Sequence, residues 1–365
     1  MELVRNKIEI QSRGVSVGKG LLSEMIKLFN VPWAGGTCLL FEISAGHSSK
    51  TSLACFTFIT DRTPFKVKRD AEEWFIEKGG RRYVTLRFSP RPEFYGLTTG
   101  RGRAVREFIT LGEYGSVRCS VSNRCRYIEA GKGCGFCAHQ AWWNEGDGDT
   151  VDEIAREMPG ILNEVGPDRI FLNSGTANSR DKGILLLSEA AGKIKNNTSV
   201  PVIAGFEAVR DTGFLETLKA GGVDAVYINL EAFDPGLRKS VMPNAKGQIP
   251  LSQYARNWHW CAELFGHGNV YTTAIAGLGE SDESLFDFAR AALDAGAFPV
   301  LLPFTPIVGA RSAGFHPPSP ARMEHLYIGI SRIYSRYGME PFFNDVLGRS
   351  GDAFGALKEV HEYLS

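Results

Sequence analysis

From residue 114 onward, the sequence alternates short apolar segments with amphipathic segments, and this alternation limits the possible folds more than any other feature. Strands are predicted over residues 114–121, 168–175, 201–208, 224–234, 269–280 and 298–307, and helices between them. Apolar strands joined by helices are typical of βαβ units in a parallel sheet. We therefore expect an α/β protein with a full or partial (β/α) barrel, TIM-barrel-like, of about six βα units. A doubly wound open sheet is the alternative.

The residues before this repeat have a different pattern. Strands are predicted over residues 37–44, 53–60 and 81–88, with a helix over residues 70–80. This favours an N-terminal α+β accessory region over residues 1–112 and a barrel core over residues 113–340. The C-terminal extension, residues 341–365, is expected to complete the barrel, and segment 340–348 is a candidate seventh strand.

The overall charge bears on the kind of partner to expect. Lys+Arg and Asp+Glu both number 41, so the formal net charge is zero. This balance gives no reason to expect a nucleic acid or an acidic membrane surface as the main partner. The first residues lack the apolar core of a signal peptide, and no apolar run is long enough to span a membrane. We therefore expect a cytoplasmic protein.

The cysteines are concentrated in one short stretch. Four of the seven, Cys119, Cys125, Cys134 and Cys137, lie within residues 119–137, and the last three belong to "CRYIEAGKGCGFC". In a large cytosolic protein, such a group indicates a metal site more than disulfides. Zinc is one candidate, with Cys134 and Cys137 as one ligand pair and Cys119, Cys125 or His139 completing the set. The other is a four-iron cluster on three thiolates, which leaves one iron open to bind a small molecule.

The spacing Cys-x8-Cys-x2-Cys of Cys125, Cys134 and Cys137 resembles the signature of the radical S-adenosylmethionine (radical SAM) enzymes. Most members have Cys-x3-Cys-x2-Cys after the first strand, with an aromatic residue just before the third cysteine, where this chain has Phe136. The first spacing is longer here than in most members. The resemblance extends over about residues 114–312.

Two later segments strengthen the resemblance. "TTAIAGLGE" is similar to the Gly-x-Ile-x-Gly-x-x-Glu segment of the family's fifth strand, which packs near the adenine, although alanine replaces the first glycine. "YINLEAFDPGLRKSVMP" resembles the fourth strand of the biotin-synthase-like branch. The resemblance implies that Asn229 and Glu231 meet the ribose and that Arg238 faces the methionine carboxylate. The fifth-strand candidates for cofactor binding are Ile275, Gly277 and Glu280.

The second strand departs from the family pattern. "FLNSGT" stands where members often have Gly-Gly-Glu, which receives the methionine amino group, and the acid is absent here. The candidates at this position are Asn173, Ser174 and Thr176. Each match also has a structural interpretation, and for Glu280 this is a cap of the helix that follows it.

The resemblance implies a definite chemistry. The cysteines would hold a [4Fe–4S] cluster that reductively cleaves S-adenosylmethionine to a 5′-deoxyadenosyl radical, which abstracts hydrogen from a substrate. Reduced ferredoxin or flavodoxin would donate the electron. The branch includes biotin synthase and hydrogenase-maturation enzymes, so the expected substrate is a small molecule, a cofactor precursor or a carrier-bound group. Candidate substrate-lining residues near the strand ends are Glu207, Tyr227, Thr305 and Arg311.

Two other functions stay open. Lipoyl-synthase-type enzymes use a second cluster for sulfur insertion, and this chain has candidate ligands for one in Cys38, Cys55, Cys119 and Ser350. The alternative for Cys38 and Cys55 is that both are ordinary buried thiols in apolar strands. The second alternative is a zinc-stabilised barrel, which would bind a ligand or partner without redox chemistry.

Overall fold

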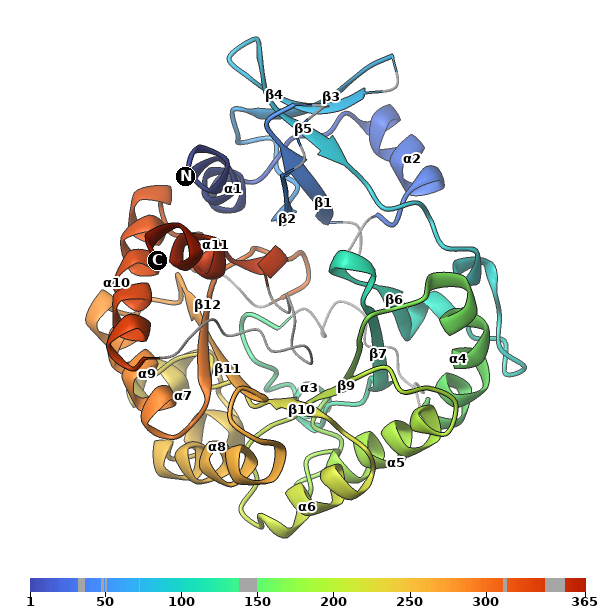
Figure 1. The fold of residues 1–365 in the computed structure, drawn as a ribbon, viewed down its shortest axis with the longest axis vertical. Helices are drawn as coiled ribbons and strands as arrows, with labels where there is room; N and C mark the ends of the chain where they lie inside the picture. Colours follow the sequence, from blue (N-terminus) through green and yellow to red (C-terminus); the bar gives the residue numbers. More distant parts are fainter. Residues whose placement is uncertain are drawn as a thin grey trace.

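The computed structural model describes residues 1–31, 37–46, 49, 51–71, 73–137, 150–310, 314–338 and 352–365. Its larger sheet has the order β12-β11-β10-β9-β8-β7-β6, in which β7 to β12 run parallel and β6 is antiparallel to β7. Spatial order follows chain order, so the sheet forms an open arc with helices outside it, a partial barrel and not a doubly wound sheet (Figure 1). The strands are β6 (Ile109–Leu111), β7 (Val117–Ser122), β8 (Ile170–Ser174), β9 (Val202–Gly205), β10 (Ala225–Tyr227), β11 (Val270–Ala276) and β12 (Phe298–Pro303).

Several helices outside the arc, among them α4, α5, α8 and α9, pack against the strands. In the helix Leu251–Phe265, Tyr254, Trp258, Cys261 and Phe265 recur at helical spacing and are buried, as expected for an amphipathic helix. No helix of the described residues is long and apolar enough to cross a membrane. The helices are α3 (Arg126–Glu129), α4 (Val151–Val165), α5 (Ile184–Lys195), α6 (Gly213–Ala220), α7 (Pro235–Val241), α8 (Leu251–Phe265), α9 (Asp282–Asp294) and α10 (Pro320–Arg336).

Side chains fill part of the barrel interior. Arg118 on β7 pairs with Glu113 at 2.6 Å, and its guanidinium carbon lies 4.6 Å from the ring centroid of Phe171. The rings of Tyr227 and Tyr271 are stacked with centroids 5.2 Å apart. This interior is packed like that of other small barrels, so an active site is expected at the C-terminal ends of the strands.

The second sheet is antiparallel, with the order β2-β1-β5-β4-β3. The helix predicted over residues 70–80 is wrong, because this segment contains β4. Trp74 and Ile76 alternate with less buried neighbours and pair with Leu86 and Val84 on β5, so the period is that of a strand. The elements of this region are α1 (Glu2–Arg13), α2 (Lys19–Leu28), β1 (Cys38–Ser44), β2 (Ser52–Phe58), β3 (Phe65–Asp70), β4 (Glu73–Lys78) and β5 (Arg81–Arg87).

The N-terminal sheet lies across the open side of the arc, with β1 and β2 facing the barrel (Figure 1). Phe56 on β2 packs against Phe354, with ring centroids 4.7 Å apart. The backbone N–H of Ala54 donates to the Tyr114 hydroxyl at 3.0 Å. Residues 352–365 contain α11 (Leu357–Leu364), whose Glu359 forms a buried ion pair with Lys7 of α1. The predicted strand at 340–348 lies outside the described residues.

Candidate active site

The three cysteines of the "CRYIEAGKGCGFC" stretch lie on the segment that follows β7. Cys125 immediately precedes the short helix α3, and Cys134 and Cys137 lie on the loop after it. All three are partly exposed, whereas Cys38, Cys55, Cys119 and Cys261 are fully buried. The loop after the first barrel strand is therefore the place in this fold where thiols can reach a ligand.

Hydrogen bonds between the cysteine loop and the region around α7 hold the loop in place. The N–H of Gly135 donates to the carbonyl of Val241 at 2.8 Å. The side-chain amide of Asn244 donates to the carbonyl of Lys132 at 2.8 Å and to Cys134 Sγ at 3.5 Å. Burial raises the pKa of the Cys134 thiol, while Lys246 and Asn244 act in the opposite direction. An N–H directed at sulfur is suited to a thiolate that ligates a metal.

A close backbone contact fixes the position of Cys125. A Cβ placed on Gly175, after β8, would lie 2.2 Å from the carbonyl oxygen of Arg124 and 3.0 Å from Cys125 Cβ. The N–H of Arg126 donates to the carbonyl of Thr176 at 3.1 Å. Only glycine lets the two strand ends approach this closely.

An apolar cluster connects the loop to β11. Phe136 and Cys134 pack against a group that includes Ile275 and the buried Leu278 and Phe304. The structure thus brings together Phe136 and Ile275, two residues predicted to bind the cofactor. They form an apolar wall beside the cysteine loop.

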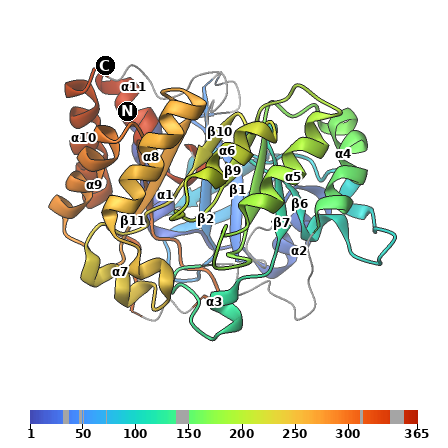
Figure 2. The same cartoon turned by 90° about the horizontal axis from the view of Figure 1, so that it is seen from below.

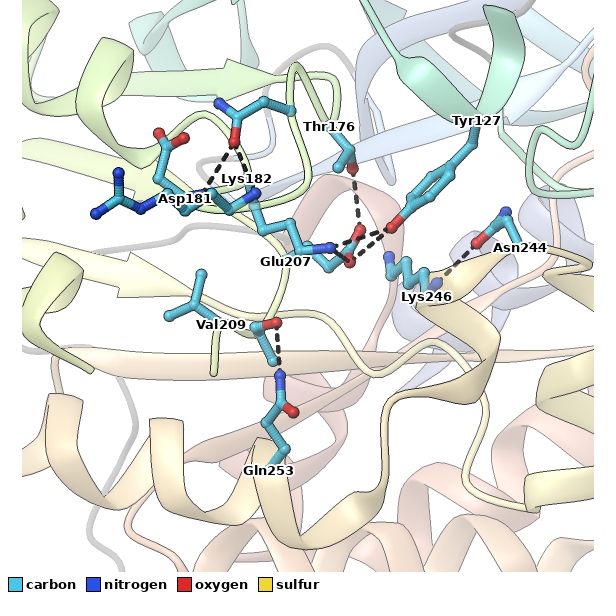
Figure 3. A network of polar contacts seen from close by, with 12 residues as sticks. Tyr127, Thr176, Asp181, Lys182, Glu207, Val209, Asn244, Lys246 and Gln253 are labelled. Atoms are coloured by element: carbon cyan, nitrogen blue, oxygen red, sulfur yellow. Dashed lines mark hydrogen bonds and ion pairs between the residues drawn. The ribbon is translucent and has the colours of Figure 1, made fainter. Parts of the chain in front are cut away.

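A network of charged side chains is centred on Glu207, which follows β9 (Figure 3). Its carboxylate accepts hydrogen bonds from the Tyr127 hydroxyl and from Thr176 Oγ1, both at 2.9 Å, and pairs with Lys182 Nζ at 2.9 Å. The side chains of Glu207 and Lys182 are only 4% and 12% exposed. Burial, and then the nearby Glu207, raise the pKa of the Tyr127 hydroxyl, which therefore remains a donor.

A second ion pair lies after β10. Glu231 Oε1 is 3.1 Å from Lys246 Nζ. Glu231 has a φ of 71°, uncommon for a residue other than glycine, and strained backbone of this kind concentrates at functional sites. Burial alone would lower the pKa of Lys246, but Glu231 and other anionic neighbours raise it above its ordinary value. Next to this pair, the side-chain oxygen Oδ1 of Asn229 is buried with no hydrogen-bond partner within the described structure.

Arg238 and Glu280 make internal contacts. The terminal nitrogens of Arg238 donate to the carbonyls of Ile249 at 2.6 Å and Lys246 at 3.2 Å. Glu280 accepts from the N–H groups of Gly277 and Leu278 at 2.9 and 2.8 Å and pairs with Arg322 on α10. Arg238, on α7, therefore stabilises the turn that follows this helix, and Glu280 stabilises the loop between β11 and α9.

The remaining candidates are dispersed. Ser174 Oγ donates to the carbonyl of Gly175 at 2.7 Å, and Asn173 lies one residue before it on β8. Thr305 follows β12 and is partly exposed. Arg311 lies outside the described residues.

The auxiliary cluster predicted on Cys38, Cys55, Cys119 and Ser350 requires a correction. Cys38 packs in the cluster between β1, β2 and Phe354, and Cys55 packs in the separate core of the N-terminal sheet. Cys119 belongs to the core between the barrel strands and helices. Three thiols in three separate cores do not form one ligand set, and burial raises the pKa of Cys38 and Cys55 to about 12. Ser350 lies outside the described residues.

Sequence reasoning did not identify Tyr127, Lys182, Asn244 or Lys246. Lys182 has a left-handed φ of 59° just before α5, and Asn244 and Lys246 belong to the turn after α7. Tyr127 lies within the cysteine stretch itself, but Lys182, Asn244 and Lys246 are far from the cysteines in sequence, and no short motif surrounds them. Only the folded chain places them beside the cysteine loop and Glu207.

The thiols and the polar groups around them suit an iron–sulfur cluster better than a single metal ion. No three His, Cys, Asp or Glu side chains of the described residues lie close enough to hold a single metal ion. A four-iron cluster differs from one zinc ion in that each thiolate binds a different iron. Three partly exposed thiols, an amide N–H on Cys134 Sγ and the unpartnered Asn229 oxygen suit a cluster with a polar ligand beside it.

Comparison with known proteins assigns the class. The Radical SAM superfamily model matches residues 119–292, which contain all three cysteines, the strands β8 to β11 and the Glu207 and Glu231 positions. The chain therefore contains a radical SAM domain, and enzymes of this superfamily use a [4Fe–4S] cluster and S-adenosylmethionine. A comparison with curated proteins gave no match.

The chain is also similar to several solved structures. Methylornithine synthase is 15% identical, with a TM-score of 0.48, and the alignment covers 67% of this chain and 72% of that one. A maturase of the [FeFe]-hydrogenase is 17% identical with a TM-score of 0.47; the alignment covers 59% of this chain but only 49% of that protein. A radical SAM methyltransferase from Sphaerobacter thermophilus is 14% identical with a TM-score of 0.47, covering 74% and 75%.

Proposed function

We propose that Cys125, Cys134 and Cys137 hold the [4Fe–4S] cluster and that S-adenosylmethionine binds beside it, over the C-terminal ends of β8 to β11. The observation that carries this proposal is the position of three partly exposed thiols on the loop after β7, with the amide of Asn244 directed at Cys134 Sγ. Ligands of parallel barrels bind at this end of the strands.

The surrounding residues have distinct proposed roles. Phe136 and Ile275 form the apolar wall for the adenine, and Asn229 and Glu231 are the polar groups for the ribose. When bound, the cluster and S-adenosylmethionine supply reductive cleavage to methionine and a 5′-deoxyadenosyl radical, which takes hydrogen from the substrate. The protein orients these groups and excludes water from them. Gly277, another of the predicted cofactor-binding residues, forms the turn after β11, where its φ of 109° favours glycine.

The substrate that this site favours is small and polar, for example a cofactor precursor. Glu207 and Lys182 form a buried charged pair at the strand ends, and buried charges are retained where they contact one another or a ligand. The electron donor is a reduced ferredoxin or flavodoxin. The structure supports no ligand set for sulfur insertion, because the other described cysteines are buried in separate places.

The metal content of the protein tests this proposal. After anaerobic reconstitution, we expect about four iron and about four acid-labile sulfide per chain. Inductively coupled plasma analysis and a sulfide assay on the same sample measure both, together with zinc. Iron and sulfide near eight per chain would require a second ligand set. Zinc without iron would show that the site is structural and not a radical-generating centre.

A further inference from the structure

A group of exposed cations lies beside the cysteine loop. Arg124 and Arg126 flank Cys125, Lys132 precedes Cys134, and Lys239 lies on α7. We refer to these four cations as the basic rim. Arg124 approaches Glu129 at 3.5 Å, but the other three have no acidic partner within the part of the chain that the structure describes. On a chain with a net charge of zero, this is a local excess of positive charge.

The parts of the basic rim belong to one surface. The side chain of Asn244 donates to the carbonyl of Lys132, and Gly135 donates to the carbonyl of Val241, the last residue of α7. These bonds join the loop that carries Lys132 to the helix that carries Lys239. Figure 2 shows α3 and α7 at the same end of the barrel.

A hollow of about 450 Å³ opens within this surface, lined by Lys239, Met242, Pro243, Asn244 and Gln248. Lys239, Pro243 and Gln248 are exposed, so the hollow faces solvent, whereas Asn244 is buried. The amide of Asn244 lies 3.5 Å from Cys134 Sγ. One lining residue therefore connects the solvent-facing hollow directly to a proposed cluster ligand.

We propose that the basic rim and this hollow form the docking surface for a small acidic one-electron carrier, a reduced flavodoxin. This inference rests on the proposed function, because it requires a cluster at Cys134. One electron leaves the carrier, which is oxidised by one electron, and reduces the cluster by one electron, with no bond made or broken. Complementary charge brings such partners together quickly and orients them.

The test compares two double charge reversals in the reconstituted holoenzyme. Lys132→Glu with Lys239→Glu removes two cations of the rim. Lys219→Glu with Arg332→Glu makes the same change in net charge on α6 and α10 and serves as the control. Flavodoxin is the probe: its affinity is measured by titration calorimetry at low and physiological ionic strength, and its electron-transfer rate by stopped-flow absorbance. Reduction by dithionite and iron content are measured in parallel.

For the rim variant, we expect affinity and electron-transfer rate to fall roughly tenfold at low ionic strength, and salt to reduce the difference. Iron content and dithionite reduction should stay unchanged, and the control should behave like the wild type. Equal behaviour of the two double variants towards flavodoxin, with iron present in both, would overturn the docking surface alone. Absence of iron from the wild type would instead overturn the proposed function.

Discussion

Replacing Cys134 by alanine is expected to remove the iron–sulfur cluster. Iron should fall from about four per chain to less than about one, and the brown colour should be lost, because two thiolates do not retain a four-iron cube. Cys134 also receives the amide hydrogen bond of Asn244 at 3.5 Å, which the variant loses. Iron and sulfide analysis after anaerobic reconstitution measures the effect.

The matched control for this variant is Cys261→Ala. Cys261 is fully buried on α8, so its truncation costs packing energy, about 1 to 2 kcal/mol, but not a ligand. This variant should retain about four iron per chain. If Cys134→Ala retained as much iron as Cys261→Ala, Cys134 would not be a cluster ligand.

The second large effect is expected for Glu207→Ala. This change leaves Lys182 buried without its partner and removes the acceptor of Tyr127 and Thr176. Breaking a buried ion pair on one side costs roughly 3–5 kcal/mol, so the free energy of unfolding should fall by about that amount. Anaerobic urea unfolding of the reconstituted enzyme, followed by fluorescence, provides the measurement.

Three further variants separate the ion pair from general surface effects. Glu283→Ala removes one exposed partner of Arg290, and its cost should stay within about 0.5 kcal/mol. Lys182→Met removes the cation alone. Combined with Glu207→Ala, Lys182→Met should recover part of the lost stability, because the uncompensated charge is gone. A double variant as unstable as the sum of the two single variants would show that the pair is not coupled.

The barrel could be predicted from the sequence, because its strands are buried apolar runs separated by amphipathic helices. The segment 70–80 could not, since charged residues surround Trp74 and Ile76, and their period-2 burial depends on pairing with β3 and β5. Local composition there resembles an exposed helix. The partner strands decide its conformation.

The cysteine loop could also be predicted, because its residues are close together in sequence. The residues that surround it come from distant turns: Lys182 precedes α5, and Asn244 and Lys246 follow α7. No spacing rule connects such positions, which only the folded barrel brings to one end. The prediction of an auxiliary cluster is wrong for a related reason: Cys38 and Cys55 are on neighbouring strands, but their side chains lie in different cores.

The most direct test of the account is the fate of S-adenosylmethionine itself. The reconstituted protein is incubated anaerobically with S-adenosylmethionine and dithionite, and 5′-deoxyadenosine and methionine are quantified by liquid chromatography with mass spectrometry. We expect both products to form in equal amounts, and Cys134→Ala to form neither. A protein that holds about four iron per chain, is reduced by dithionite and leaves S-adenosylmethionine intact would contradict this expectation.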